Sequence, residues 1–239
     1  DWEVEVRGEL PNLDLVPLDE TNIVVKAACA LAQSAGIENP QPMRFLIEKQ
    51  IPVAGGMAGG SADAAAALIA LNEHWCLGKT HEQLAQVGAL VGADVPFALL
   101  GGTALGVGTG TTLTKLEDCS ELHIVLIIND SPLSTKSVFE RFDVLYPQGQ
   151  ELSDSLSEHY IHRLGENSLL EPALSLQSGL SEILRLDLGI PGGFLSGSGP
   201  TVWFASESFE QASGAFEKAR ALGYHAVQTK TSTLGARLS

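Results

Sequence analysis

The chain has 239 residues, of which 29 are acidic and 14 are basic, so its formal net charge is −15. This acidic balance, without any local run of Lys or Arg, excludes nucleic acid as the expected partner. No apolar run approaches the ~18 residues of a membrane span. Cys29, Cys76 and Cys119 have neither metal-site nor disulfide-framework spacing. We therefore expect a cytoplasmic protein that contacts no membrane.

The first part of the chain predicts a strand, a helix and a second strand. Residues 2–6 alternate apolar and polar side chains, as a half-buried strand does. Thr21 can cap a helix whose apolar face runs to Ala35, and Gly36 is placed to end it. Residues 45–51 alternate again, which predicts a strand that leads into a glycine-rich loop.

The loop at residues 51–63, Ile-Pro-Val-Ala-Gly-Gly-Met-Ala-Gly-Gly-Ser-Ala-Asp, runs straight into an alanine-rich helix former with Ser61 as its predicted N-cap. Glycines open backbone amides to an anion, and the helix adds its positive dipole end. The lysine of Walker A and the glycine spacing of the dinucleotide fingerprint are both absent. We interpret the loop as a phosphate cradle, with a glycine-rich turn that binds nothing as the alternative.

Further elements follow in the second half of the chain. Thr80 and Gln83 form a capping-box pair that begins a helix. In the turn at residues 92–97, Pro96 argues against a continuing helix. The remaining predicted elements are strands at 102–107, 123–128, 201–205 and 225–230, and helices at 136–145, 156–164, 168–186 and 209–222. We place the domain boundary near residue 130, which gives domains 1–130 and 131–239.

Three motifs, in order and separation, resemble those of the GHMP kinase family. Residues 52–63 resemble its phosphate loop, residues 92–97 the segment that carries the catalytic aspartate in one branch, and residues 195–202 its third glycine loop. The resemblance spans nearly the whole chain. It implies a two-domain α+β fold, in which a ribosomal-protein-S5-like N-terminal domain precedes a ferredoxin-like C-terminal domain.

The sequence departs from the family pattern in two places. Met57 and Ala58 stand where the family usually has Leu-Gly. The family's N-terminal lysine strand and substrate loop have no counterpart, and the chain begins at Asp1 without a methionine. We therefore expect an N-terminal segment of the natural protein to be missing, and with it a catalytic lysine and part of the substrate pocket.

The resemblance implies an ATP-dependent kinase that uses Mg²⁺ and acts on a small phosphorylated substrate. Asp94 is the implied general base, or the group that orients the substrate hydroxyl, and its apolar neighbours predict an apolar turn in which an unpaired carboxylate is costly. A carboxylate that merely caps the turn is the alternative. The residues implied at the ATP phosphates are Gly55, Gly56, Met57, Ala58, Gly59, Gly60 and Ser61.

Other implied site residues have structural alternatives. The Ser61 hydroxyl is also the implied protein ligand of Mg²⁺, although a plain N-cap explains it too. Asn22 and Lys49 match positions on the adenosine side, where a solvated helix or strand end is the alternative. For Asp63 we expect a role in favouring the helix dipole or fixing the loop. The implied substrate-side residues are Thr135, Phe139, Ser196 and Gly197.

Thr135 and Phe139 match a stretch that meets a cytidine moiety in one branch of the family. Phe139 can stack on the base, or can pack as a core residue of a helix face. Other kinases of the family, of the homoserine or mevalonate type, are the nearest functional alternatives. A non-catalytic nucleotide-binding relative and a structural protein with a glycine-rich bend are the others. A homodimer is compatible with the sequence.

Overall fold

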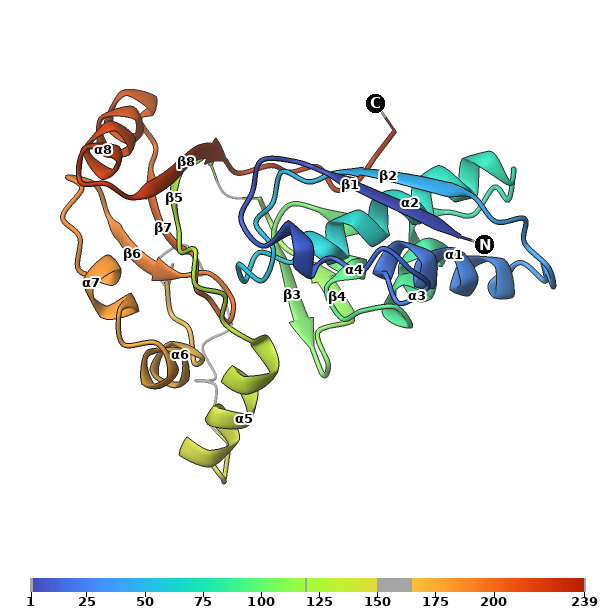
Figure 1. Ribbon diagram of the computed structural model, residues 1–239, viewed down its shortest axis with the longest axis horizontal. Coiled ribbons are helices and arrows are strands. Elements are labelled where there is room, and N and C mark those ends of the chain that lie inside the picture. Colours follow the sequence, from blue (N-terminus) through green and yellow to red (C-terminus); the bar gives the residue numbers. More distant parts are fainter. Residues whose placement is uncertain (1, 119, 150–164, 239) are drawn as a thin grey trace. The chain divides into compact units, whose positions relative to one another are not determined.

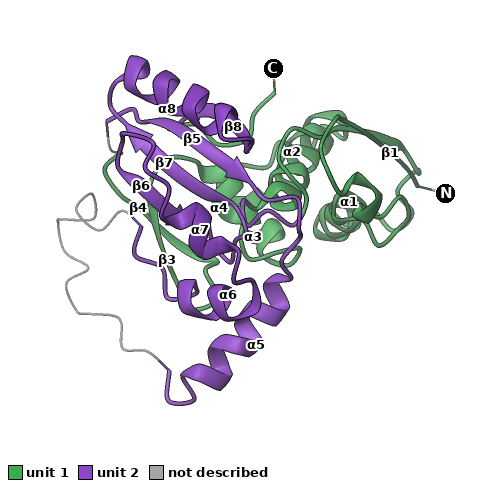
Figure 2. Cartoon of the chain, turned by 60° about the vertical axis from the view of Figure 1, so that its left-hand side comes forward, with its two compact units in different colours: residues 1–53, 58–118, 232–239 green, residues 54–57, 119–231 purple. Residues whose placement is uncertain are grey.

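The computed structural model describes residues 2–118, 120–149 and 165–238. The chain forms two compact units (Figure 2). Unit 1 comprises residues 1–53, 58–118 and 232–239, and unit 2 comprises residues 54–57 and 119–231. Unlike the predicted division at residue 130, these units exchange two segments. Residues 54–57 belong with the second unit, and the C-terminal residues belong with the first.

Unit 1 combines helices with two pairs of strands (Figure 1). β1 (Glu3–Arg7) pairs in parallel with β2 (Arg44–Glu48), and α1 (Ile23–Ser34) supplies the crossover that a parallel pair needs. A 3₁₀ turn, η1 (Leu13–Leu15), precedes α1. The remaining elements are α2 (Gly59–His74), α3 (His81–Ala89), α4 (Val95–Leu100) and the antiparallel hairpin of β3 (Ala104–Val107) and β4 (Thr112–Lys115).

The core of unit 1 lies around α2. Ala64, Ala65 and Leu68 of α2 are fully buried in one cluster with Ala28 and Leu31 of α1. Alanine side chains let helix backbones approach closely, and burial of this apolar face fixes α2 far more firmly than helix propensity alone would. The predicted phosphate loop therefore ends at the start of a helix that is firmly packed in the core.

Unit 2 is built on a four-stranded antiparallel sheet. Its strand order is β6 (Gly192–Leu195), β7 (Val202–Ser206), β5 (His123–Ile128) and β8 (His225–Lys230). β5 bonds to both β7 and β8, so it belongs to unit 2, although the predicted division assigned it to the first domain. The helices are α5 (Thr135–Leu145), α6 (Leu170–Leu176), α7 (Leu180–Leu184) and α8 (Phe209–Ala221).

The core of unit 2 joins the sheet to its helices. Val125, Ile127 and Phe204 of the strands are buried in one cluster with Leu180 of α7 and Ala215 of α8. Such a sheet with helices packed against it is the α+β arrangement predicted from the sequence.

Several local predictions are confirmed. β5 and β8 occupy the predicted ranges 123–128 and 225–230. The Thr80–Gln83 capping box is present at the start of α3, with the Thr80 N–H donating to Gln83 Oε1 at 2.9 Å. The predicted helix at 156–164 lies outside the described residues. Among the described residues, no helix is both long and apolar enough to cross a membrane.

Three local predictions are wrong. Asn22, not Thr21, caps α1, and the Thr21 hydroxyl donates to Asp19 instead. Pro96 does not prevent a helix, because it lies in the first turn of α4, where the missing N–H removes no helical bond. The single helix predicted at 168–186 is two short helices, since the backbone leaves the helical region at Gln177 (φ −138°, ψ 85°).

Candidate functional site

The predicted phosphate loop has a left-handed backbone at three positions. Ala54 (φ 54°), Gly56 (φ 70°) and Ala58 (φ 50°) all lie in this region, which is costly for alanine. Ala58 is the N-cap residue of α2, so the helix begins at Gly59. Ser61 is therefore the third residue of the helix, and its predicted N-cap role is wrong. The helix thus begins after the left-handed backbone of Ala58, and no side chain of the described residues caps it.

The first turn of α2 presents open backbone donors. The earliest N–H with a helical acceptor belongs to Ala62, which donates to the Ala58 carbonyl at 3.0 Å. The N–H groups of Gly59, Gly60 and Ser61 donate to no other described residue. A helix N-terminus leaves such amides free by construction, and its dipole favours an anion there.

Gly59 is enclosed by unit 1 side chains. A Cβ atom built on it would lie 2.9 Å from Ile51 Cγ2 and 3.2 Å from Lys49 Nζ. At Gly60 the nearest atom, Ile23 Cγ2, would be 3.8 Å away, an ordinary contact. The two neighbouring glycines therefore differ, since only Gly59 lies where a side chain forces its surroundings to move.

In unit 2, residues 55–56 of the phosphate loop are joined to the third glycine loop by one side-chain and one backbone hydrogen bond. The Ser196 hydroxyl donates to the Gly56 carbonyl at 3.0 Å, and the Thr201 N–H reaches the Gly55 carbonyl at 3.4 Å. A Cβ on Gly56 would lie 2.3 Å from the Ser196 carbonyl oxygen, so only glycine fits there. The structure thus brings Gly55 and Gly56, expected at the ATP phosphates, together with Ser196, expected on the substrate side.

The substrate-side residues of unit 2 also meet this loop in part. Thr135, the first residue of α5, hydrogen-bonds through its hydroxyl to that of Ser198 at 3.0 Å. Ser198 is 5% exposed and was not singled out from the sequence, because one serine in a Ser-Gly repeat carries no distinguishing signal. Phe139 is 51% exposed on α5, so core packing, the alternative considered for it, is wrong.

A buried ion pair supports the start of α2 in unit 1. Lys49 directly follows β2, and its ammonium binds the carboxylate of Asp63 on α2, with side chains 5% and 20% exposed respectively. Burial raises the pKa of Asp63, and the Lys49 ammonium partly offsets this. The Lys49 backbone is fixed by donation to the Arg7 carbonyl at 2.7 Å. The solvated strand end considered for Lys49 is therefore wrong.

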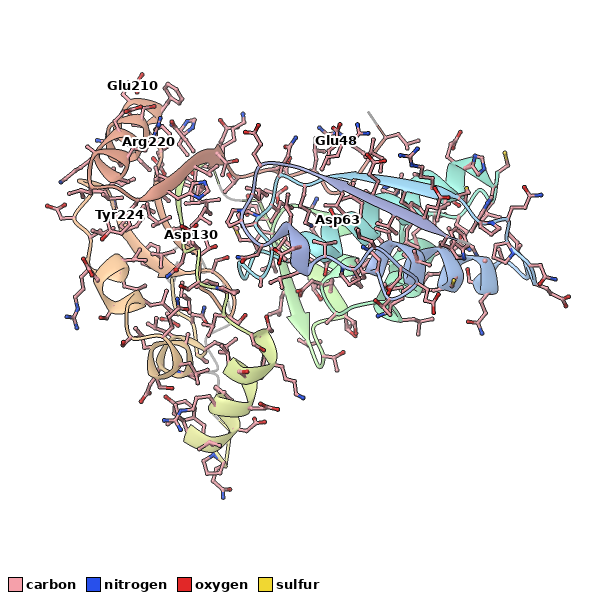
Figure 3. The ribbon with its side chains drawn as sticks, in the orientation of Figure 1. Glu48, Asp63, Asp130, Glu210, Arg220 and Tyr224 are labelled. Atoms are coloured by element: carbon pink, nitrogen blue, oxygen red, sulfur yellow. The ribbon has the colours of Figure 1, made fainter. Side chains whose placement is uncertain are left out.

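Asp63 also borders a hollow in unit 1. The cavity has a volume of about 450 Å³ and lies between β2 and α2, where Glu48 and Asp63 contribute carboxylates (Figure 3). Ala66, Ala67 and Ala70 of α2 form part of its wall. Asp63, the partner of Lys49 on the helix, thus lies at the edge of this cavity.

Asp94 follows a turn that approaches the first turn of α2. It occupies the N-cap position of α4, but its side chain makes no capping bond and is exposed. Two expectations for Asp94 are therefore wrong. Its apolar neighbours do not bury the carboxylate, and the carboxylate does not cap the helix that follows. Val95 and Pro96 take the buried positions instead. The preceding turn contacts α2, since a Cβ on Gly92 would lie 4.0 Å from Ser61 Oγ.

Asn22 is 2% exposed and its side chain has two partners in the chain. Its Oδ1 accepts from the Val24 N–H at 2.9 Å, and its Nδ2 donates to the Pro17 carbonyl at 2.6 Å. The solvated helix end considered for Asn22 is thus wrong. The next residue, Ile23, contacts the position of Gly60, so Asn22 lies close to the start of α2.

The donor set for a cation is small. Within residues 2–118, 120–149 and 165–238, no three His, Cys, Asp or Glu side chains converge as a metal site would require. The Ser61 hydroxyl makes no hydrogen bond to another described residue, and Asp63 is engaged by Lys49. Mg²⁺ fits such a site only when phosphate oxygens and water supply most ligands, which is its usual mode with nucleotides.

Comparison with known proteins gives a consistent picture. Residues 22–102 match the GHMP kinases N terminal domain. A 4-diphosphocytidyl-2-C-methyl-D-erythritol kinase from Nocardia farcinica is 42% identical over 222 residues, which are 87% of this chain and 71% of that protein.

Two solved structures extend the comparison. A crystal structure of 4-(cytidine 5'-diphospho)-2C-methyl-D-erythritol kinase has a TM-score of 0.72 and 29% identity, with coverage of 96% of this chain and 82% of that one. A homoserine kinase from Cytophaga hutchinsonii has a TM-score of 0.69 and 19% identity, with coverage of 97% and 82%. At 19% identity, that second likeness shows only a shared fold.

Proposed function

Because the chain belongs to the GHMP kinase family, in the branch of the 4-diphosphocytidyl-2-C-methyl-D-erythritol kinases, we propose that it phosphorylates the 2-hydroxyl of that cytidyl alcohol with ATP. The reaction belongs to the non-mevalonate synthesis of isoprenoid precursors. The structural observation that carries the proposal is the open set of amides at residues 59–61, directly after the glycine loop.

Phosphoryl transfer requires positioning and charge stabilisation more than covalent chemistry from the protein. The N–H groups of Gly59, Gly60 and Ser61 hold phosphate oxygens, and the α2 dipole stabilises their negative charge. The left-handed bends at Gly56 and Ala58 shape the loop that leads to these amides. This cradle needs no lysine of the Walker type.

Asp94 acts on the acceptor hydroxyl in this proposal. Its exposed carboxylate has no hydrogen bond or ion pair with another described residue, so it is available to orient the hydroxyl and accept its proton. Asn22 and Lys49 support the nucleotide side of the cradle. Thr135 and the exposed ring of Phe139 are assigned to the cytidyl alcohol, together with Ser196 and Gly197.

We assign Mg²⁺ to the ATP phosphates with the Ser61 hydroxyl as its protein ligand. When bound, the ion neutralises phosphate charge during transfer. The free hydroxyl of Ser61 supports this assignment, and the engagement of Asp63 by Lys49 argues against a second protein ligand there. The cytoplasmic location and the homodimer stay predictions.

A substrate panel tests the proposal. The chain is incubated with Mg²⁺, γ-labelled ATP and, separately, the cytidyl alcohol, homoserine and mevalonate. Label should move only to the cytidyl alcohol, and Asp94→Asn should abolish most of that transfer. Labelling of homoserine or mevalonate instead would assign the chain to another kinase type. ATP binding without transfer to any acceptor would favour a non-catalytic relative.

A further inference from the structure

One side chain outside the proposed site supports the loop between β6 and β7. Asn167 lies before α6, and its Nδ2 donates to the carbonyl oxygens of Leu195 at 3.2 Å and Gly197 at 2.7 Å. Its Oδ1 accepts from the Leu169 N–H at 2.9 Å. Both ends of the amide are therefore engaged, which holds the side chain in one orientation.

The bond to Gly197 determines where the next amide points. Gly197 has a left-handed backbone (φ 52°), and its carbonyl faces Asn167. In a trans peptide the C=O and N–H point in opposite directions. The N–H of Ser198, in the same peptide, must therefore point away from Asn167.

The Ser198 amide has no acceptor of its own. It donates to no other described residue, although Ser198 is only 5% exposed. Unpaired N–H groups are rare at buried residues, so this open donor indicates a binding partner. The amide next to it in the loop, that of Gly199, is different, because it donates to the Ser196 carbonyl at 2.7 Å.

The loop between β6 and β7 also contacts Gly56 of the proposed phosphate loop, within unit 2. A Cβ atom on Gly197 would lie 2.8 Å from the Gly56 carbonyl oxygen, and the Ser196 hydroxyl donates to that oxygen. Asn167 thus acts on Gly56 through the backbone of residues 195–197.

We propose that Asn167 is a positioning residue for phosphate binding. It orients the Gly197–Ser198 peptide so that the Ser198 N–H is presented to a phosphate oxygen, and it holds the backbone against which Gly56 packs. This inference rests on the proposed function for the nature of its ligand. The contact with Gly56 identifies ATP as the expected source of that oxygen, and the diphosphate of the cytidyl alcohol is the other source with the same chemistry.

The test uses two isosteric substitutions. Asn167→Asp removes both Nδ2 donors and keeps the acceptor for Leu169. The matched control is Asn72→Asp, because Asn72 Nδ2 donates to the Lys79 carbonyl and its Oδ1 accepts from the Lys79 N–H, each at 3.0 Å. Asn72 lies in α2, outside the proposed site. Thermal melting verifies that both variants are folded, and Asn167→Ala replaces Asn167→Asp should the latter fail to fold.

Affinity for MgATP is measured by calorimetry, and the KM values for ATP and the cytidyl alcohol by turnover. Asn167→Asp should weaken MgATP binding about tenfold with little change in kcat, because hydrogen bonds of this kind contribute roughly 0.5–1.5 kcal/mol. Asn72→Asp should change the affinity for MgATP by less than about twofold. A rise confined to the KM of the cytidyl alcohol would support the proposal with that diphosphate as the ligand.

Protonation offers a second readout. At low pH the new carboxyl group of the Asn167→Asp variant is protonated and regains an O–H donor. The loss of MgATP affinity in this variant, relative to the unmodified chain at the same pH, should therefore become smaller. Unchanged affinity for both substrates, or an equal loss in Asn72→Asp, would overturn the proposal. Absence of turnover by the unmodified chain would contradict the proposed function alone, because the calorimetric comparison with ATP still decides the role of Asn167.

Discussion

The Lys49 ammonium and the Asp63 carboxylate form a buried ion pair that ties the end of β2 to α2. Figure 3 labels Asp63 on the helix. Fourteen positions separate the two residues in the sequence, and the glycine loop lies between them. The pair therefore closes the base of the loop within unit 1 and limits how far the first turn of α2 can move.

Breaking this pair on one side should destabilise the chain. Lys49→Met leaves a carboxylate with little solvent, and should lower the free energy of unfolding by roughly 2–3 kcal/mol. The double variant Lys49→Met, Asp63→Leu should lose less than Lys49→Met alone, because it leaves no unpaired charge. Urea denaturation of both variants and of Asp63→Leu gives the coupling energy. Additive losses would show that the pair contributes nothing beyond its separate side chains.

The same carboxylate predicts a dependence of stability on pH. Burial raises the pKa of Asp63, so the folded chain binds this proton more tightly than the unfolded chain does. The protonated form of Asp63 therefore contributes stability to the folded chain. This contribution is complete below the pKa of Asp63 in the unfolded chain, about 4, and is lost as pH rises through the higher pKa of the folded chain. Relative to Asp63→Asn, the unmodified chain should lose stability over this window. A relative gain with rising pH would mean that Lys49 outweighs burial.

Asp94→Asn tests the proposed role of the exposed carboxylate. The amide has the same shape but cannot accept the hydroxyl proton, so kcat should fall by about 10²-fold or more. Since Asp94 makes no capping bond, the melting temperature and ATP affinity should be almost unchanged. A kcat within about threefold of the unmodified chain would exclude a role in proton transfer.

Gly56→Ala and Gly60→Ala separate loop packing from helix formation. At Gly56 the new methyl group would meet the Ser196 carbonyl at 2.3 Å in a left-handed backbone, so ATP affinity and stability should both fall. At Gly60 it meets only Ile23, at 3.8 Å, in a helix where alanine is favoured by about 1 kcal/mol. Equal melting temperatures for the two variants would contradict this difference.

Ala58→Gly should stabilise the chain. Ala58 has φ 50° and ψ 32°, a conformation that costs an L-residue about 1–2 kcal/mol and glycine almost nothing. The added flexibility of the unfolded chain offsets part of this gain, so we expect a net increase of roughly 0.5–1 kcal/mol. Chemical denaturation measures it, with Ala62→Gly, inside the helix, as a control that should destabilise. A loss of stability in Ala58→Gly would show that Ala58 is not strained.

Features encoded by neighbouring residues could be predicted from the sequence. The apolar run at residues 123–128, the Thr80–Gln83 capping box and the glycine loop before α2 each depend on a few consecutive side chains, and each is present. The order and separation of three motifs also sufficed for the family. The periodicity and capping signals are local, because each acts within one or two turns of the backbone.

Only the tertiary structure decided which distant residues meet. Ser196 and Gly56 are 140 positions apart, and Asn167 and Gly197 are 30 apart, yet hydrogen bonds join both pairs. Packing also placed the N-cap of α2 at Ala58 rather than at Ser61, and left Asp94 exposed among apolar neighbours. These outcomes follow from burial and close packing summed over a whole unit, which the side chains near any one position do not specify.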